Sequence, residues 1–311
     1  MKKIWLLGLA FILVFSSCFN KQIIFNTADQ YFPTDAIRQV EDASCAIAVY
    51  YFMGEEEYLK RVSGTRTSGV WRECIFPKIE RNLYYSFKTI FSLKPTLLQT
   101  IMPLDKFDFN GQPIYVIAYI GAGHLTRFDH IVSVRHLFVH DDNTYNKKIW
   151  VFLKNMDHAI EADLTAISLG NEFSDDYAVI RLKETTGRRG LKIARPDSLK
   201  KGMKAIASGS VGGTAYFHRF VTVSTFKYFL QRKSDGGLHL SFWENFEYLM
   251  NFPGGPGDSG GALIIIEDGE PKIATITYCG IEIYAEQYVF SNPTSMLWEF
   301  LREYRLEWIG K

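Results

Sequence analysis

The residues best suited to chemistry lie in the glycine-rich stretch from Gly254 to Leu263. Ser259 stands there after Asp258 and before two glycines, and an apolar segment follows. Glycine lets the backbone adopt conformations closed to other residues, and it lets a substrate carbonyl approach main-chain N–H groups. A nucleophilic serine beside an oxyanion hole needs both properties, so the stretch predicts Ser259 as a nucleophile. A plain flexible loop is the alternative, because Gly, Pro, Asp and Ser also dominate turns.

A serine hydroxyl is a poor nucleophile until a histidine takes its proton. His136 follows a short apolar run, Ile131 to Val134, and no other histidine of the chain has this context. Taken singly, His136 is equally well read as a surface histidine without a role. Its place directly after an apolar strand makes it the best candidate for the general base.

A carboxylate must hold that histidine in one tautomer. Asp176 opens the segment up to Leu182, in which apolar residues alternate along one face of a strand. This alternation favours Asp176 over its neighbour Asp175, although an aspartate at a strand start is also a common turn residue. His136, Asp176 and Ser259 are thus the three candidates for a catalytic triad.

These segments resemble the active-site signatures of trypsin-like (chymotrypsin-fold) serine proteases. Residues 257–261 read Gly-Asp-Ser-Gly-Gly, and residues 176–182 match the family's Asp-Ile-Ala-Leu-Leu-Lys-Leu pattern. Residues 131–137 match Val-Leu-Thr-Ala-Ala-His, except that Arg135 stands where a small residue is usual. The opening strands most resemble those of bacterial HtrA-like peptidases, here without a PDZ domain. The resemblance covers roughly 37–54 and 110–311.

The resemblance implies an all-β fold of two six-stranded Greek-key barrels with a C-terminal α-helix and a catalytic cleft between the barrels. It implies a serine endopeptidase that hydrolyses peptide bonds of a protein or peptide substrate through an acyl-enzyme, with the N–H groups of Gly257 and Ser259 as the oxyanion hole. No acid stands at the expected floor of the specificity pocket, so cleavage after Lys or Arg is not expected. The implied substrate-binding residues are Pro253, Thr277, Tyr278, Cys279 and Gly280.

Two other functions remain open. A catalytically silent trypsin-fold lipoprotein that acts as a binding or scaffold protein would account for Arg135 and for a long insertion. An esterase with a Gly-Asp-Ser motif normally carries that motif near the N-terminus of an α/β fold, and this sequence has neither feature.

The elements that must position the triad read as many short strands without interleaved helices, which predicts an all-β barrel or sandwich. A helix should begin at Pro293 and Thr294, because apolar residues recur from Met296 to Tyr304 at helical spacing. The expected strands lie at 45–51, 113–120, 130–134, 149–153, 164–167, 177–182, 203–207, 220–226, 262–266, 273–278 and 288–290.

The N-terminal segment reads as a signal peptide. Lys2 and Lys3 precede an apolar run, Ile4 to Phe15, and small residues lead to Cys18. Cys18 resembles the cysteine of a bacterial lipobox, which would be lipidated and anchor the protein in a membrane, and ordinary cleavage nearby is the alternative. Residues 1–18 are thus a targeting segment, 19–36 a linker and 37–311 the protease domain. The protein is expected in the cell envelope as a lipoprotein, or otherwise secreted or periplasmic.

Residues 55–110 form an insertion that is long for a loop and should carry structure or a function of its own. Its apolar part, from Tyr84 to Met102, would lie against the barrel, over the cleft or at a membrane surface.

Composition excludes several classes of function. The formal net charge is +1 and no basic patch stands out, so no nucleic-acid partner is expected. No Cys/His spacing indicates a metal site, and no cofactor is expected. Cys45 and Cys74 could form one disulfide or stay free thiols. The oligomeric state is left open.

Overall fold

The computed structural model describes residues 32–56, 106–109, 112–139, 146–154, 156, 158–169, 176–200, 202–209, 217–224, 228–232, 238–242, 248–251, 258–283, 286–291 and 294–311. The predictions on the signal peptide, on Cys18, on Pro253 and Gly257, and on most of the insertion fall outside these residues. Within them, no helix has the length and apolar character that a membrane crossing requires.

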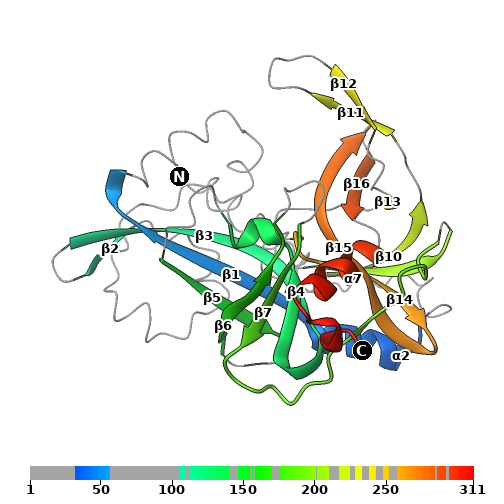
Figure 1. The fold of residues 1–311 in the computed structure, drawn as a ribbon, viewed down its shortest axis with the longest axis horizontal. Helices are drawn as coiled ribbons and strands as arrows, with labels where there is room; N and C mark the ends of the chain where they lie inside the picture. Colours follow the sequence, from blue (N-terminus) through cyan, green and yellow to red (C-terminus); the bar gives the residue numbers. More distant parts are fainter. Residues whose placement is uncertain are drawn as a thin grey trace, which may run out of the picture. The chain divides into compact units, whose positions relative to one another are not determined.

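Six strands close the first barrel by antiparallel pairing (Figure 1). The order around it is β1-β5-β6-β7-β4-β3, and β3 pairs back onto β1. A further strand, β2 (Lys106–Phe109), extends β3 at its edge, so the last residues of the expected insertion belong to the first sheet. The six strands are β1 (Ser44–Met53), β3 (Gln112–Leu125), β4 (His130–Ser133), β5 (Asn146–Leu153), β6 (Ile160–Ile167) and β7 (Ala178–Leu182).

The second barrel closes in the same way, in the order β14-β9-β10-β13-β16-β15, with β15 pairing back onto β14. A two-residue strand, β8 (Lys192–Ile193), runs parallel to β15, and β11 (Tyr228–Arg232) pairs with β12 (Leu238–Phe242) as a separate hairpin. Two closed six-stranded sheets are the architecture that the family resemblance implied. The strands of this barrel are β9 (Lys204–Gly209), β10 (Phe217–Ser224), β13 (Tyr248–Asn251), β14 (Ala262–Glu267), β15 (Glu270–Ile283) and β16 (Glu286–Ser291).

Aliphatic side chains, most of them alanine, valine or isoleucine, fill the narrow interior of the second barrel. Its core consists of residues that are almost wholly buried, and Met203 packs against them. Strand β14 is buried on both faces except at Ile266, which explains why it reads as a continuous apolar run. The core residues are Ala194, Leu199, Ala205, Ala207, Val221, Val223, Leu263, Ile265 and Ala274.

The predicted C-terminal helix is present as α7 (Thr294–Glu303). Leu297, Phe300 and Leu301 are its buried apolar residues, as the spacing indicated. The indole N–H of Trp298 donates a hydrogen bond to the carbonyl of Ala194 at 2.7 Å, which ties the helix to the chain after β8. Three short 3-10 helices complete the described elements: η1 (Arg127–Asp129), η2 (Arg135–Leu137) and η4 (Glu307–Ile309).

The structure corrects the sequence analysis at the start of the domain. A helix, α2 (Thr34–Ala43), occupies the end of the expected linker and the first residues of the expected protease domain. Ala36, Val40 and Ala43 are buried at a spacing of three and four residues, which is the periodicity of a helix that packs one face. The same spacing is visible in the sequence, so the expected linker overlooked a helix signal.

The end of α2 is joined to both barrels. Immediately after it, the hydroxyls of Ser44 in β1 and Ser208 in β9 share a hydrogen bond of 2.8 Å, and both residues are buried. The amide of Gln39 donates to the carbonyl of Gly190, in the chain between the barrels, at 3.4 Å. The helix therefore fixes the start of β1 against the second barrel.

Cys45 is a free, buried thiol, so the alternative of a Cys45–Cys74 disulfide is wrong. Burial raises the pKa of this thiol, and the protonated form persists. The residue behaves as a small apolar side chain in β1.

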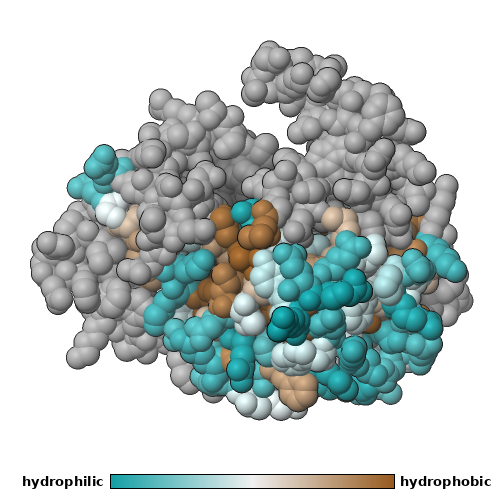
Figure 2. All heavy atoms as spheres, in the orientation of Figure 1, coloured by the Kyte–Doolittle hydropathy of each residue, from teal (hydrophilic) through white to brown (hydrophobic). Residues whose placement is uncertain are grey.

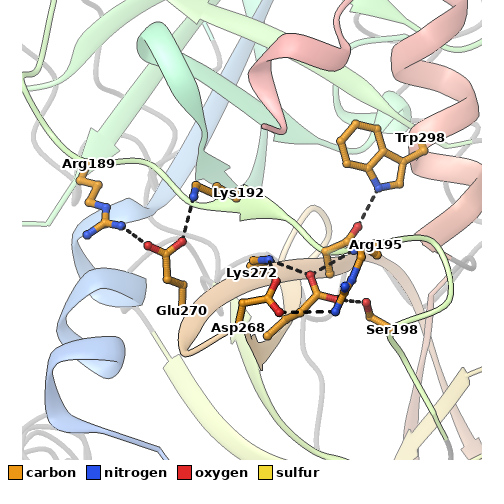
Figure 3. A network of polar contacts seen from close by, with 10 residues as sticks. Arg189, Lys192, Arg195, Ser198, Asp268, Glu270, Lys272 and Trp298 are labelled. Atoms are coloured by element: carbon orange, nitrogen blue, oxygen red, sulfur yellow. Dashed lines mark hydrogen bonds and ion pairs between the residues drawn. The ribbon is translucent and has the colours of Figure 1, made fainter.

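Charged residues clamp the turn between β14 and β15 to the chain that links the barrels (Figure 3). Glu267 accepts hydrogen bonds from Lys272 at 2.8 Å, from Arg195 at 3.0 Å and from Ser198. Nearby, Glu270 pairs with Arg189 and Lys192.

Hydrophilic side chains cover much of the lower part of the face drawn in Figure 2, whereas hydrophobic surface gathers near its centre.

This clamp predicts a dependence of stability on acid. Burial alone would raise the pKa of Glu267, but its three donors outweigh burial and lower the pKa to about 2. A carboxyl whose pKa is lowered on folding stabilises the protein above the usual value of 4.5, and this contribution is lost as the pH falls toward 2. Over that range, the free energy of unfolding of the wild type should fall by about 3 kcal/mol more than that of Glu267→Gln.

Urea unfolding at a series of pH values measures this difference. Glu299→Gln, on the exposed side of α7, is the matched control and should keep the wild-type dependence. Parallel curves for the wild type and Glu267→Gln would contradict the assignment.

Candidate active site

His136 lies on a tight turn at the end of a strand. Strand β4 ends at Ser133, Val134 stays extended, and the chain then turns into the 3-10 helix η2 that carries His136. The imidazole is 18% exposed, so solvent and a bound molecule can reach it. A short helix directly after a buried strand thus holds the ring at the surface of the first barrel.

Asp176 contacts His136 at two points. Its Oδ1 accepts the backbone N–H of His136 at 2.9 Å, and its Oδ2 lies 2.6 Å from Nδ1 of the ring. An ionised carboxylate can only accept hydrogen bonds, so Nδ1 carries the proton of this pair and the lone pair of the neutral ring is on Nε2. This is the tautomer that a general base opposite a serine hydroxyl requires.

The carboxylate of Asp176 is fully buried, at the chain position just before β7. The next residue, Tyr177, is fixed in both directions by Ser168: its N–H donates to the Ser168 hydroxyl at 3.0 Å, and its carbonyl accepts the Ser168 N–H at 2.9 Å. A buried carboxylate with rigid neighbours keeps its orientation when the partner ring gains a proton.

Ser259 lies in a turn that glycine alone can form. Gly260 has a φ of +86°, and a Cβ there would collide with the carbonyl of Ala122 and the hydroxyl of Ser133. The turn is closed by the N–H of Gly261, which donates to the Asp258 carbonyl at 2.8 Å. Gly260 is therefore required by close packing against the first barrel, whereas a Cβ on Gly261 would collide with the carbonyl of Ser208 in the second barrel.

Strand β3 joins the serine turn to the histidine turn. The N–H of Ala122 donates to the carbonyl of Ser259 at 2.7 Å. A Cβ on the preceding residue, Gly121, would lie 2.7 Å from the same carbonyl and would collide with Leu137, the residue after His136. The structure thus brings the backbone of Ser259 beside the turn of His136, although the two belong to different barrels.

The predicted substrate-binding strand lies on β15. The hydroxyl of Thr277 donates to the carbonyl of Gly261 at 3.0 Å, and the backbone N–H of Gly260 donates to the Thr277 carbonyl at 2.9 Å. The ladder between β15 and β14 ends at the pair Ile276 and Ala262. From Tyr278 to Gly280, β15 therefore pairs only with β16 among the described strands.

The remaining predicted residues are partly or wholly outside the description. Pro253 and Gly257 lie outside it, and for Tyr278 and Cys279 only the backbone of β15 is described. Within the described ranges, no cluster of three or more His, Cys, Asp or Glu residues is placed to hold a metal ion.

Sequence reasoning missed the residues that connect the two turns. Ser133, whose hydroxyl donates to the Ala122 carbonyl at 2.7 Å, and Gly121 are examples. Their one local signal is the glycine pair Gly121 and Gly123 inside an apolar strand, which marks a close backbone approach. The identity of the approaching segment has no local signal.

Comparison with known proteins gives the fold. No protein-family model matches the chain, and no curated protein sequence matches it. The active form of the Rv3671c protease from M. tuberculosis superposes with a TM-score of 0.50 at 13% identity, over 86% of this chain and 82% of that one. The HtrA-type protease AlgW, solved with a decapeptide, gives a TM-score of 0.51 at 16% identity over 87% of this chain.

This chain covers 66% of the length of AlgW. The likeness, together with the two closed sheets and the C-terminal helix, shows that the fold is trypsin-like and related to that of HtrA-type proteases. At such identities the likeness concerns the fold alone, and the residues of the site carry the argument about function.

Proposed function

We propose that the protein is a serine endopeptidase that hydrolyses peptide bonds through His136, Asp176 and Ser259. The two-point contact between His136 and Asp176 carries the proposal, since it presents Nε2 of the ring as a base. The solved structures that share the fold are named as proteases, and one of them was solved with a peptide.

In the proposed mechanism, Ser259 Oγ attacks the carbonyl carbon of the scissile peptide while His136 Nε2 takes the hydroxyl proton. Asp176 stabilises the resulting imidazolium, which then gives its proton to the leaving amine. The N–H groups of Gly257 and Ser259 hold the oxyanion, and such a donor typically contributes about 3 kcal/mol. Water then hydrolyses the acyl-enzyme by the reverse sequence of proton transfers.

The substrate would bind as an added strand along β15. The backbone from Tyr278 to Gly280 has one side without a described strand partner, and main-chain hydrogen bonds to an extended peptide fit such an edge. Pro253 offers no charge for a basic side chain, so the proposed specificity is for residues other than Lys and Arg.

A fluorophosphonate probe tests the nucleophile directly because it reacts only with an activated serine. The wild type should be labelled, whereas Ser259→Ala and His136→Ala should not be. Ser295→Ala, on α7, is the matched control and should be labelled like the wild type. A wild type that resists the probe while its thermal unfolding is normal would contradict the proposal and favour the silent binding protein.

We further propose that the protein is exported and that Cys18 carries a lipid, on the strength of residues 1–18. In cells fed an alkyne-tagged fatty acid, the wild type should become tagged and Cys18→Ser should not. Equal tagging of both would rule out lipidation at this residue.

A further inference from the structure

The turn that carries His136 ends in carbonyl groups that need partners from elsewhere. The N–H groups of Phe138 and Val139 both donate to the carbonyl of Arg135. The carbonyls of Leu137 and Phe138 then lie at the end of the 3-10 helix, where no backbone N–H of the helix reaches them. Their partners decide how firmly the turn is held.

A cross-strand pair on β1 and β5 supplies both donors. The hydroxyl of Tyr51 donates to the Leu137 carbonyl at 2.9 Å, and the ammonium of Lys147 donates to the Phe138 carbonyl at 2.8 Å. Tyr51 and Lys147 stand directly opposite each other in the antiparallel register, so their side chains leave the same face of the sheet. Two adjacent side chains therefore bind two successive carbonyls.

The partial burial of the Lys147 ammonium costs free energy of hydration, which a residue that only filled space would not need to lose. Lys147 is half-buried, burial lowers its pKa, and it forms no ion pair with a described residue. A methionine would fill the same space without the loss of hydration that a partly buried ammonium suffers. The neighbouring Lys148, by contrast, faces Glu161 at 3.5 Å. The hydrogen bond from Lys147 to the Phe138 carbonyl is thus the interaction that offsets this loss of hydration.

We propose that Tyr51 and Lys147 are positioning residues that hold the His136 turn, so that Nδ1 stays on Asp176 and Nε2 keeps one direction. Neither residue touches the reacting atoms. The kinetic part of this inference rests on the proposed peptidase function, whereas the hold on the His136–Asp176 pair does not.

Two single substitutions test the pair. Tyr51→Phe keeps the buried ring and removes the hydroxyl, and Lys147→Met keeps the length of the side chain and removes the ammonium. Each should lower the rate of fluorophosphonate labelling and kcat by about 10-fold with KM unchanged, as expected for one lost hydrogen bond that orients a base. Lys147→Arg, which retains a cationic donor, should recover most of the rate, and Lys148→Met is the matched control.

A second readout does not depend on catalysis. The proton between His136 Nδ1 and Asp176 should give a far-downfield NMR resonance, assigned by its absence in His136→Ala. In Tyr51→Phe and Lys147→Met it should broaden through faster exchange with water, whereas Lys148→Met should leave it unchanged.

A sharp resonance in both variants, or equal broadening in Lys148→Met, would overturn the inference. If the wild type does not react with the probe and yet the resonance broadens as expected, the peptidase function fails and the positioning role stands.

Discussion

Asp176→Asn is expected to lower kcat by about 10⁴-fold while the protein stays folded. The asparagine carbonyl can still accept the backbone N–H of His136, which Oδ1 accepts in the wild type. Its amide would then face Nδ1 and donate to it, where Oδ2 accepts now. The ring proton would move to Nε2, and the imidazole could no longer take a proton from Ser259.

Steady-state hydrolysis of a peptide substrate measures this loss, with thermal unfolding as the check on folding. Asp163→Asn on β6 is the matched control. This exposed carboxylate pairs with Lys183 and takes no part in the contact between His136 and Asp176. A loss of less than 10-fold in Asp176→Asn would mean that another group sets the tautomer of His136.

Gly121→Ala should have the second largest effect, a loss of about 100-fold or more in the rate of fluorophosphonate labelling. The added methyl group would lie 2.7 Å from the Ser259 carbonyl and would also collide with Leu137. Relief of these contacts must move the serine turn away from the histidine turn, and a shift of about 1 Å in a reacting group costs roughly 100-fold.

Gly54→Ala is the control for this substitution, since a Cβ at Gly54 meets no atom within 4 Å. It should label at the wild-type rate. If Gly121→Ala also labels at that rate, the contact between β3 and the serine turn is not needed for the approach of Ser259 to His136.

The sequence was sufficient for most strands of the two barrels and for the C-terminal helix. Asp176 could be chosen over Asp175 because of the alternation of apolar residues from Ala178 to Leu182, and the structure places Asp176 against His136. Helix α7 was recognisable from the spacing of its apolar residues. In each case the signal is local, a period of two or of about 3.6 residues.

The contacts that assemble the site could not be predicted because they join segments that are far apart in the chain. The Ala122–Ser259 hydrogen bond and the Tyr51–Leu137 hydrogen bond depend on barrel closure and on strand register. Local sequence periodicity encodes neither of these. Helix α2 is a different case: its signal is local, since Ala36, Val40 and Ala43 repeat at helical spacing, and the expected linker overlooked it.

The division of the proposed triad between the barrels has a consequence for the newly made chain. The ribosome produces the first barrel, with its acid and base, up to Leu182 before it reaches Ser259 and the strands that seat it. A chain whose synthesis stops between these points would hold a complete His136–Asp176 pair and no nucleophile. Under the proposed mechanism, hydrolysis would begin only once the second barrel has folded and placed Ser259 against β3.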